Sequence, residues 1–116
     1  MSFAALKRHA AALPGVTVDL KWQVDWVASV GGRMFAVGGP EPGRWSHIAF
    51  KVDDHRFLEL SGLPGFAPAP YLARAHWVQV SKPAALPLAE MKALVERSHA
   101  LVSARLTKRA RAALGL

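Results

Sequence analysis

The stretch PGFAPAPYLARAHWVQVSKP, residues 64–83, decides how the rest of this chain is arranged. Pro64-Gly65 and the triplet Pro68-Ala69-Pro70 predict an irregular loop, because proline lacks the backbone N–H that helices and sheets use. The sequence then becomes apolar, and residues 77–80 predict a short strand that ends before Lys82-Pro83. We therefore expect a proline-stiffened loop that leads one strand into the core.

The residues before this stretch predict a helix followed by antiparallel strands. Ser2 is a candidate N-cap for the helix, which should end at Pro14-Gly15. Gly31-Gly32 separates two apolar runs and predicts a hairpin with a primed turn, so at least one of these glycines should have a positive φ. The predicted strands are residues 16–22, 24–30, 33–37 and 46–52, with a loop at 38–43.

The residues after Val52 predict two more helices. Asp53 is a candidate N-cap for a short helix that should stop before Pro64. Pro87 then starts a long C-terminal helix, which we expect to run unbroken to about Arg109. A helical projection of this segment places its apolar side chains on one stripe, which should face the sheet, and several basic side chains together on one polar flank. The stripe comprises Met91, Leu94, Val95, Leu101, Val102 and Leu106, and the flank comprises Arg97, Lys108 and Arg111.

This order of elements predicts an α+β two-layer sandwich, in which an antiparallel sheet is covered on one face by the N- and C-terminal helices. The opposite face of the sheet should then be partly open. A length of 116 residues and a hydrophobic content of 52% predict a single domain over residues 1–116 with one packed core.

Composition and spacing exclude several kinds of chemistry. The chain has no cysteine, which removes disulfides, thiolate catalysis and cysteine zinc sites. The histidines at positions 9, 47, 55, 76 and 99 lack ligand spacing, so we expect no metal site. We also expect no cofactor and no catalytic residue. In the pair His76-Trp77 the tryptophan should anchor the core, and the histidine should find a backbone or side-chain partner. No apolar run is long enough to span a membrane, and we expect a cytoplasmic protein.

Positive charge is the main functional signal in the sequence. The net charge is +7, and no acidic residue follows Glu96, although basic residues do. A positive pole of this kind attracts polyanions, of which nucleic acid is the commonest. The candidate nucleic-acid-binding residues are Arg33 at the hairpin tip, Arg44 and Trp45 in the glycine-proline loop, Lys82 after the last strand, and Arg97, Lys108 and Arg111 on the C-terminal helix.

A resemblance to a known family is carried by the run Gly-Gly-Arg-Met-Phe-Ala at 31–36, by residues 68–77, and by Ser98 with the Leu101-Val102 pair. These residues are similar to the MmcQ/YjbR family, and the similarity covers nearly the whole chain. It implies a CyaY-like (frataxin-like) α/β sandwich and DNA binding through a double-wing arrangement of hairpins. His99 departs from the tyrosine of many members, whereas Arg33 keeps the charge of a frequent lysine.

Together these features predict a protein that binds double-stranded DNA mainly through its backbone, with weak sequence selectivity. The alternative is a protein-interaction or small-ligand module that uses the open sheet face and residues 66–71, and its binding would be insensitive to salt. An enzyme ranks third, because no nucleophile, base and orienting group can be assembled from the linear spacing.

Overall fold

A computed structural model of the chain describes residues 3–21, 25–39, 47–70, 72–81 and 86–116. The described helices are α1 (Ala4–Ala11), α2 (Phe57–Ser61), α3 (Leu88–Ser103) and α4 (Lys108–Ala113), with short 3-10 helices η1 (Asp54–Arg56) and η2 (Ala73–Ala75). The described strands are β1 (Val16–Lys21), β2 (Asp25–Val30), β3 (Arg33–Gly38), β4 (His47–Lys51), β5 (Phe66–Pro68) and β6 (Trp77–Ser81). No helix in these ranges is long and apolar enough to cross a membrane.

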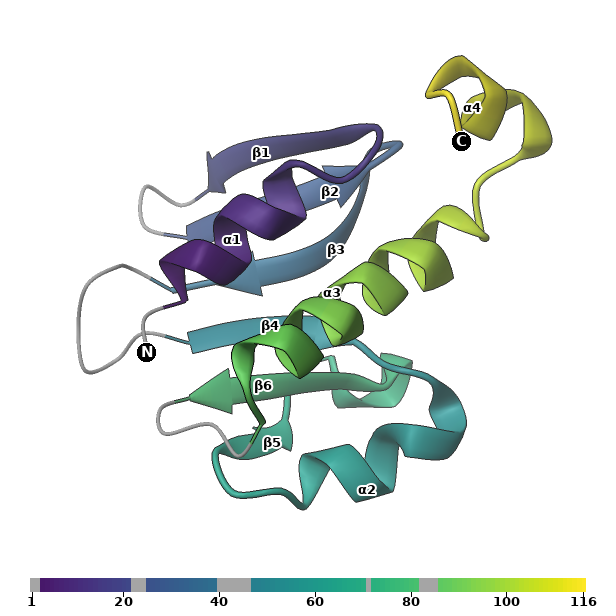
Figure 1. The fold of residues 1–116 in the computed structure, drawn as a ribbon. Helices are drawn as coiled ribbons and strands as arrows, with labels where there is room; N and C mark the ends of the chain where they lie inside the picture. Colours follow the sequence, from purple (N-terminus) through teal and green to yellow (C-terminus); the bar gives the residue numbers. More distant parts are fainter. Residues whose placement is uncertain (1–2, 22–24, 40–46, 71, 82–85) are drawn as a thin grey trace.

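The strands form one antiparallel sheet, and the helices pack on one side of it. The strand order is β1-β2-β3-β4-β6-β5, so β6 lies between β4 and the edge strand β5 and pairs with both. Figure 1 shows α1 and α3 lying across the same face of the sheet. This arrangement confirms the predicted α+β sandwich with one face covered by the helices from both ends of the chain.

The core lies between the sheet and these two helices. Phe3 and Leu6 enter it from the α1 side, Phe35 and Phe50 come from adjacent strands, and Met91 comes from α3. All five side chains are completely buried. Each contributes about 1.5–3 kcal/mol by leaving water, so the apolar spacing of the two long helices decides which face they turn inward.

The predicted hairpin is confirmed. Gly31 has φ 58° and Gly32 has φ 79°, and both therefore lie in the region that a primed two-residue turn requires. Val30 pairs with Arg33 directly across the turn. The tip of this hairpin is consequently fixed in direction by its backbone.

The proline-rich segment differs from its prediction. Residues that were expected to be irregular form β5, an edge strand that pairs Phe66 with Val80 and Pro68 with Val78. Proline is compatible with an outermost strand, because its missing N–H can be the one that faces away from the sheet. The short length of the segment and its prolines conceal a strand from sequence patterns.

The prediction of one long C-terminal helix is also wrong, because this part of the chain forms two helices. Helix α3 ends at Ser103, and α4 begins at Lys108 after a turn. Thr107 caps the second helix, since its hydroxyl accepts a hydrogen bond from the Ala110 N–H at 3.0 Å. The turn lets Ala110 and Leu114 pack against the core instead of extending past the end of the sheet.

Ser98 is fully buried on α3 and joins β3 to β4. Its hydroxyl donates to the Phe35 carbonyl at 2.7 Å and accepts from the Lys51 backbone N–H at 3.0 Å. The β3–β4 ladder ends at the pair Ala36 and Phe50, immediately before these groups. A helix side chain therefore takes the place of the next ladder hydrogen bond and satisfies two backbone groups of the sheet.

Replacing Ser98 with alanine is expected to lower the free energy of unfolding by about 2 kcal/mol, because two backbone groups lose their partner in the core. Urea denaturation measures this change. Ser103→Ala is the control, since the Ser103 hydroxyl donates only to carbonyls of its own helix, and we expect its effect to stay below about 0.5 kcal/mol. Equal losses in the two variants would contradict the bridging role of Ser98.

Candidate functional site

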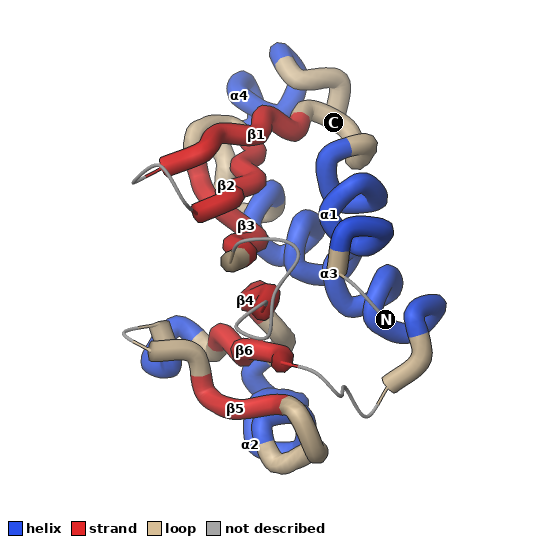
Figure 2. The backbone as a smooth tube through the Cα atoms, turned by 90° about the vertical axis from the view of Figure 1, so that its left-hand side faces the viewer, coloured by secondary structure: helices blue, strands red, loops and turns tan. Residues whose placement is uncertain are grey.

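Three segments that are distant in the sequence meet at one end of the molecule. A Cβ atom on Gly31 would lie 2.7 Å from side-chain carbons of Leu106, so the hairpin tip rests on the turn between α3 and α4. A Cβ on Gly15 would lie 3.2 Å from the Leu114 Cβ, so the turn before β1 meets the residues after α4. Figures 1 and 2 show α4 at this end, beside the start of β1.

Basic side chains gather at this end without acidic ones. We call the group the cationic end. Its residues are Arg33, Arg105, Lys108, Arg109 and Arg111. Arg111 is half-buried and the other four are exposed. Residues 26–38 and 97–116, which carry these side chains, contain no aspartate or glutamate. Within the described residues, none of the five forms an ion pair with a carboxylate.

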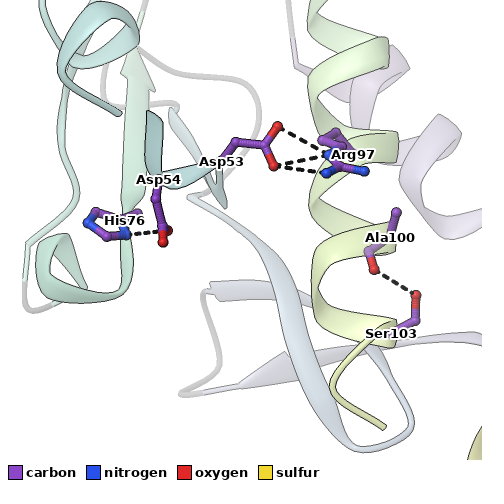
Figure 3. Close-up of polar contacts among 6 residues, drawn as sticks. All are labelled: Asp53, Asp54, His76, Arg97, Ala100 and Ser103. Atoms are coloured by element: carbon purple, nitrogen blue, oxygen red, sulfur yellow. Dashed lines mark hydrogen bonds and ion pairs between the residues drawn. The ribbon is translucent and has the colours of Figure 1, made fainter. Parts of the chain in front are cut away.

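Arg97 does not belong to the cationic end. Its guanidinium donates to both oxygens of Asp53 at 3.1–3.2 Å, as Figure 3 shows. These hydrogen bonds and the opposite charge raise the pKa of Arg97 above its ordinary value. The prediction that Arg97 shares one flank with Lys108 and Arg111 is therefore wrong, because α3 ends at Ser103, before either of them.

The remaining predicted residues have different outcomes. Arg33 is exposed at the hairpin tip, as predicted. Arg44, Trp45 and Lys82 lie outside the described residues, so their role stays a prediction.

The sequence interpretation left two members of the cationic end out of the site. On one unbroken helix, Arg105 and Arg109 would have flanked the apolar stripe, whereas the turn before α4 exposes both. The signal that could have found them is the capping residue Thr107, which marks the start of a new helix.

His76 and Asp54 form a second polar contact, between the start of β6 and η1. The Nδ1 atom of His76 lies 2.6 Å from Oδ1 of Asp54, and the imidazole packs against the Phe57 ring at 5.2 Å. These contacts hold His76 in a left-handed backbone conformation with φ 61° and ψ 46°, which is costly for a residue other than glycine. The expected side-chain partner of His76 is confirmed, and Figure 3 shows the pair beside the Asp53–Arg97 contact.

This pair lacks the other parts of a metal centre. Asp54 is 80% exposed, and His76 is 37% exposed. Among the residues that the structure describes, no group of three histidine, cysteine, aspartate or glutamate side chains could hold a metal ion. The geometry of the pair fits a clamp that ties η1 to the start of β6.

The face of the sheet opposite the helices carries a small apolar cluster. Trp77, Ala49 and Ala69 are buried there, and Leu72 packs against them. Phe66 is buried in the main core instead. Phe66, Ala69 and Trp77 thus pack inward, whereas Ala67, Pro68 and Pro70 are exposed. Tyr71 lies outside the described residues.

A hollow lies elsewhere, between α2 and α3. It has a volume of about 450 Å³, with leucines on its floor and charged residues of both signs at its rim. Its lining residues are Arg56, Glu59, Leu60, Leu63, Leu86, Glu90, Ala93 and Leu94. Arg56 already pairs with Glu59 at 3.0 Å, so no uncompensated positive charge faces this cleft.

Comparison with known proteins decides the family. The family model for YjbR matches residues 11–101. The chain belongs to the YjbR family. The match ends before Arg105, so four of the five residues of the cationic end lie beyond the part of this YjbR family member that the family model covers.

Solved structures share the fold of this YjbR family member. The crystal structure of the Deinococcus radiodurans protein DR2400, which has a DUF419 domain, is similar with a TM-score of 0.86 and 27% identity, over 99% of this chain and 88% of that one. A crystal structure of a protein from Pseudomonas syringae has a TM-score of 0.71 at 20% identity, over 87% of this chain and 98% of that one. No curated protein matches the chain.

Proposed function

We propose that the protein binds double-stranded DNA through its cationic end, with contacts to the phosphate backbone and little selectivity for sequence. The observation that carries this proposal is the gathering of five basic side chains, from a hairpin tip and the C-terminal segment, in stretches that contain no aspartate or glutamate. Phosphate contacts give affinity and position, whereas sequence is read by groups that reach base edges. The cationic end offers the first kind of group.

The shape of this end supports contact with a duplex. The two-residue turn at Gly31-Gly32 makes a narrow tip, and Leu106 beneath Gly31 supports it. Arg33 extends from this tip, and Arg105 lies next to the supporting leucine. A narrow hairpin beside a short basic helix can follow two neighbouring phosphate rows, which is consistent with a wing-like mode of binding.

Salt dependence is the property that tests this proposal. Each neutralised phosphate adds about 0.9 to the slope of log K against log salt, so the five cations would give a slope of at most about 4.5. The affinity for two duplexes of unrelated sequence should fall equally steeply as salt rises. Fluorescence anisotropy with labelled duplexes measures both quantities.

A charge-matched pair of triple variants locates the interface. The first variant, Arg105→Gln with Lys108→Gln and Arg109→Gln, should lower the salt slope by about 3. The second, Arg56→Gln with Arg74→Gln and Lys92→Gln, removes the same net charge from η1, η2 and α3 and should leave the slope nearly unchanged. Both sets are mostly exposed, so the melting temperature should change little.

The outcomes of this experiment separate the alternatives. Absence of binding at low salt, or binding that is indifferent to salt, would reject the DNA proposal. Equal losses in the two triple variants would show that net charge alone attracts the duplex, and would reject the cationic end as the interface.

A further inference from the structure

The two edges of the sheet differ in how well they are protected. Strand β5 forms one edge and is short, with Pro68 at its end. Prolines and short strands are the usual means by which proteins prevent an edge from pairing with another chain. Strand β1 forms the opposite edge, has six residues and contains no proline. The edge at β1 therefore lacks the proline and the short length that protect the edge at β5.

The hairpin shows which backbone groups of β1 are already used. Val30 pairs with Arg33 across the two-residue turn, so its backbone N–H and C=O point toward β3. Because these groups alternate in direction along a strand, the backbone N–H and C=O groups of Ser29 and Val27 on β2 point toward β1. Their partners on β1 are Thr17 and Asp19, which therefore bond to β2.

Val18 and Leu20 consequently direct their backbone N–H and C=O groups away from the sheet. Neither residue forms a backbone hydrogen bond to a turn, loop or cap in the described part of the chain. Their side chains are also exposed, Val18 at 40% and Leu20 at 73%. They lie opposite Ala28 and Trp26 on the helix-covered face. This edge thus presents unpaired polar groups and an apolar surface together.

Charge selects one way for this edge to pair with a second copy of itself. A register with Val18 opposite Leu20 would place Asp19 opposite Asp19, and like charges in that position destabilise a sheet. A register centred on Leu20 would carry Val18 beyond the end of β1. With Val18 opposite Val18, Thr17 faces Asp19 and Val16 faces Leu20. This last register opposes no like charges and brings the apolar side chains together.

We propose that two copies of the chain associate through antiparallel pairing of β1 with β1, centred on Val18. The two sheets become one continuous sheet, with the helices of both copies on the same side. Because the contact is one strand wide, its area is below that of a standard interface, and we expect a dissociation constant on the order of 100 µM. The cationic ends stay free at opposite ends of the dimer.

Sedimentation velocity from about 10 µM to about 1 mM tests this pairing. Wild-type protein should shift from monomer to dimer over that range. Val18→Pro removes an outward N–H without touching the bonds to β2, and Leu20→Lys places a charge on the edge. Both variants should remain monomeric. Leu58→Lys is the matched control, because Leu58 is 85% exposed on α2, and it should dimerise as the wild type does.

Disulfide formation tests the register, because the native chain has no cysteine. In the proposed dimer the Cα atoms of Val18 in the two copies lie about 5.5 Å apart, within the range that a disulfide spans. The two Leu20 residues lie four positions out of register, at roughly 14 Å. Val18→Cys should therefore oxidise to a covalent dimer faster than Leu20→Cys, although Leu20 is the more exposed.

Three results would overturn the proposal. If the wild-type chain stays monomeric at the highest concentration, β1 does not pair with a second copy of itself. An extended segment of another protein would then be the remaining candidate partner for this edge. Loss of the dimer in Leu58→Lys as well as in Leu20→Lys would indicate non-specific hydrophobic association. Faster oxidation of Leu20→Cys would exclude the register centred on Val18.

Discussion

Replacing Trp77 with alanine is expected to lower the free energy of unfolding by about 3–5 kcal/mol, because the loss of a large buried ring removes transfer energy and leaves a cavity. Trp77 is only 4% exposed and packs against Ala49 and Ala69 on the face of the sheet opposite the helices. Ala69 is further tied to it by a backbone hydrogen bond from its N–H to the Trp77 carbonyl at 3.0 Å. The cluster therefore holds the proline-rich segment against the sheet, and urea denaturation followed by circular dichroism measures its contribution.

The control for this variant is Leu58→Ala, which truncates a leucine that is 85% exposed. Its effect on the free energy of unfolding should be within about 0.5 kcal/mol, as for other surface substitutions. If Trp77→Ala costs less than about 1 kcal/mol, the apolar cluster on the second face does not stabilise the fold, and the assignment of Trp77 as a core anchor is wrong.

Replacing Gly31 with valine should have the second-largest effect, a loss of about 3 kcal/mol in the free energy of unfolding. Two costs combine at this position. A β-branched residue resists the φ of 58° that the turn imposes, and its Cβ would lie 2.7 Å from side-chain carbons of the buried Leu106. Thermal or urea denaturation measures the sum.

Gly32→Val separates these two costs. Gly32 has a comparable φ of 79°, but a Cβ there would meet nothing within 4 Å. The second variant should therefore lose only about 1–2 kcal/mol through backbone strain. Equal losses in the two variants would show that the contact between the hairpin tip and Leu106 does not contribute to stability, and the support of the hairpin tip would then need another explanation.

Most of the fold could be predicted from local patterns. The hairpin at Gly31-Gly32 was predictable because only glycine adopts positive φ at low cost, and a pair of glycines between apolar runs leaves few other turns. The face that α3 turns to the sheet was predictable because Met91, Leu94 and Val95 recur at helical spacing. Burial of Trp77 followed from its place in an apolar strand.

The candidate site was predictable only in part. A sequence shows that residues 97–116 carry basic side chains and no acidic ones, but it does not show which of them remain unpaired. Asp53 and Arg97 are 44 residues apart and meet because α3 crosses the sheet beside the end of β4. That contact removes Arg97 from the basic group, and the turn before α4 adds Arg105 and Arg109 to it.

Local backbone preference, residue spacing and composition are enough to predict the class of fold, the hairpin, the inward faces of the long helices and the excess of positive charge. The tertiary structure alone decided that the proline-rich segment is an edge strand, that Ser98 completes the sheet, and that the C-terminal segment folds back over the hairpin tip. These features depend on partners distant in the sequence, such as Leu106 against Gly31 and Leu114 against Gly15. Local spacing favours one continuous C-terminal helix, but the burial of Leu106 and Leu114 stabilises the structure more than that continuity would. The free energy of burial depends on the assembled core and not on neighbours along the chain.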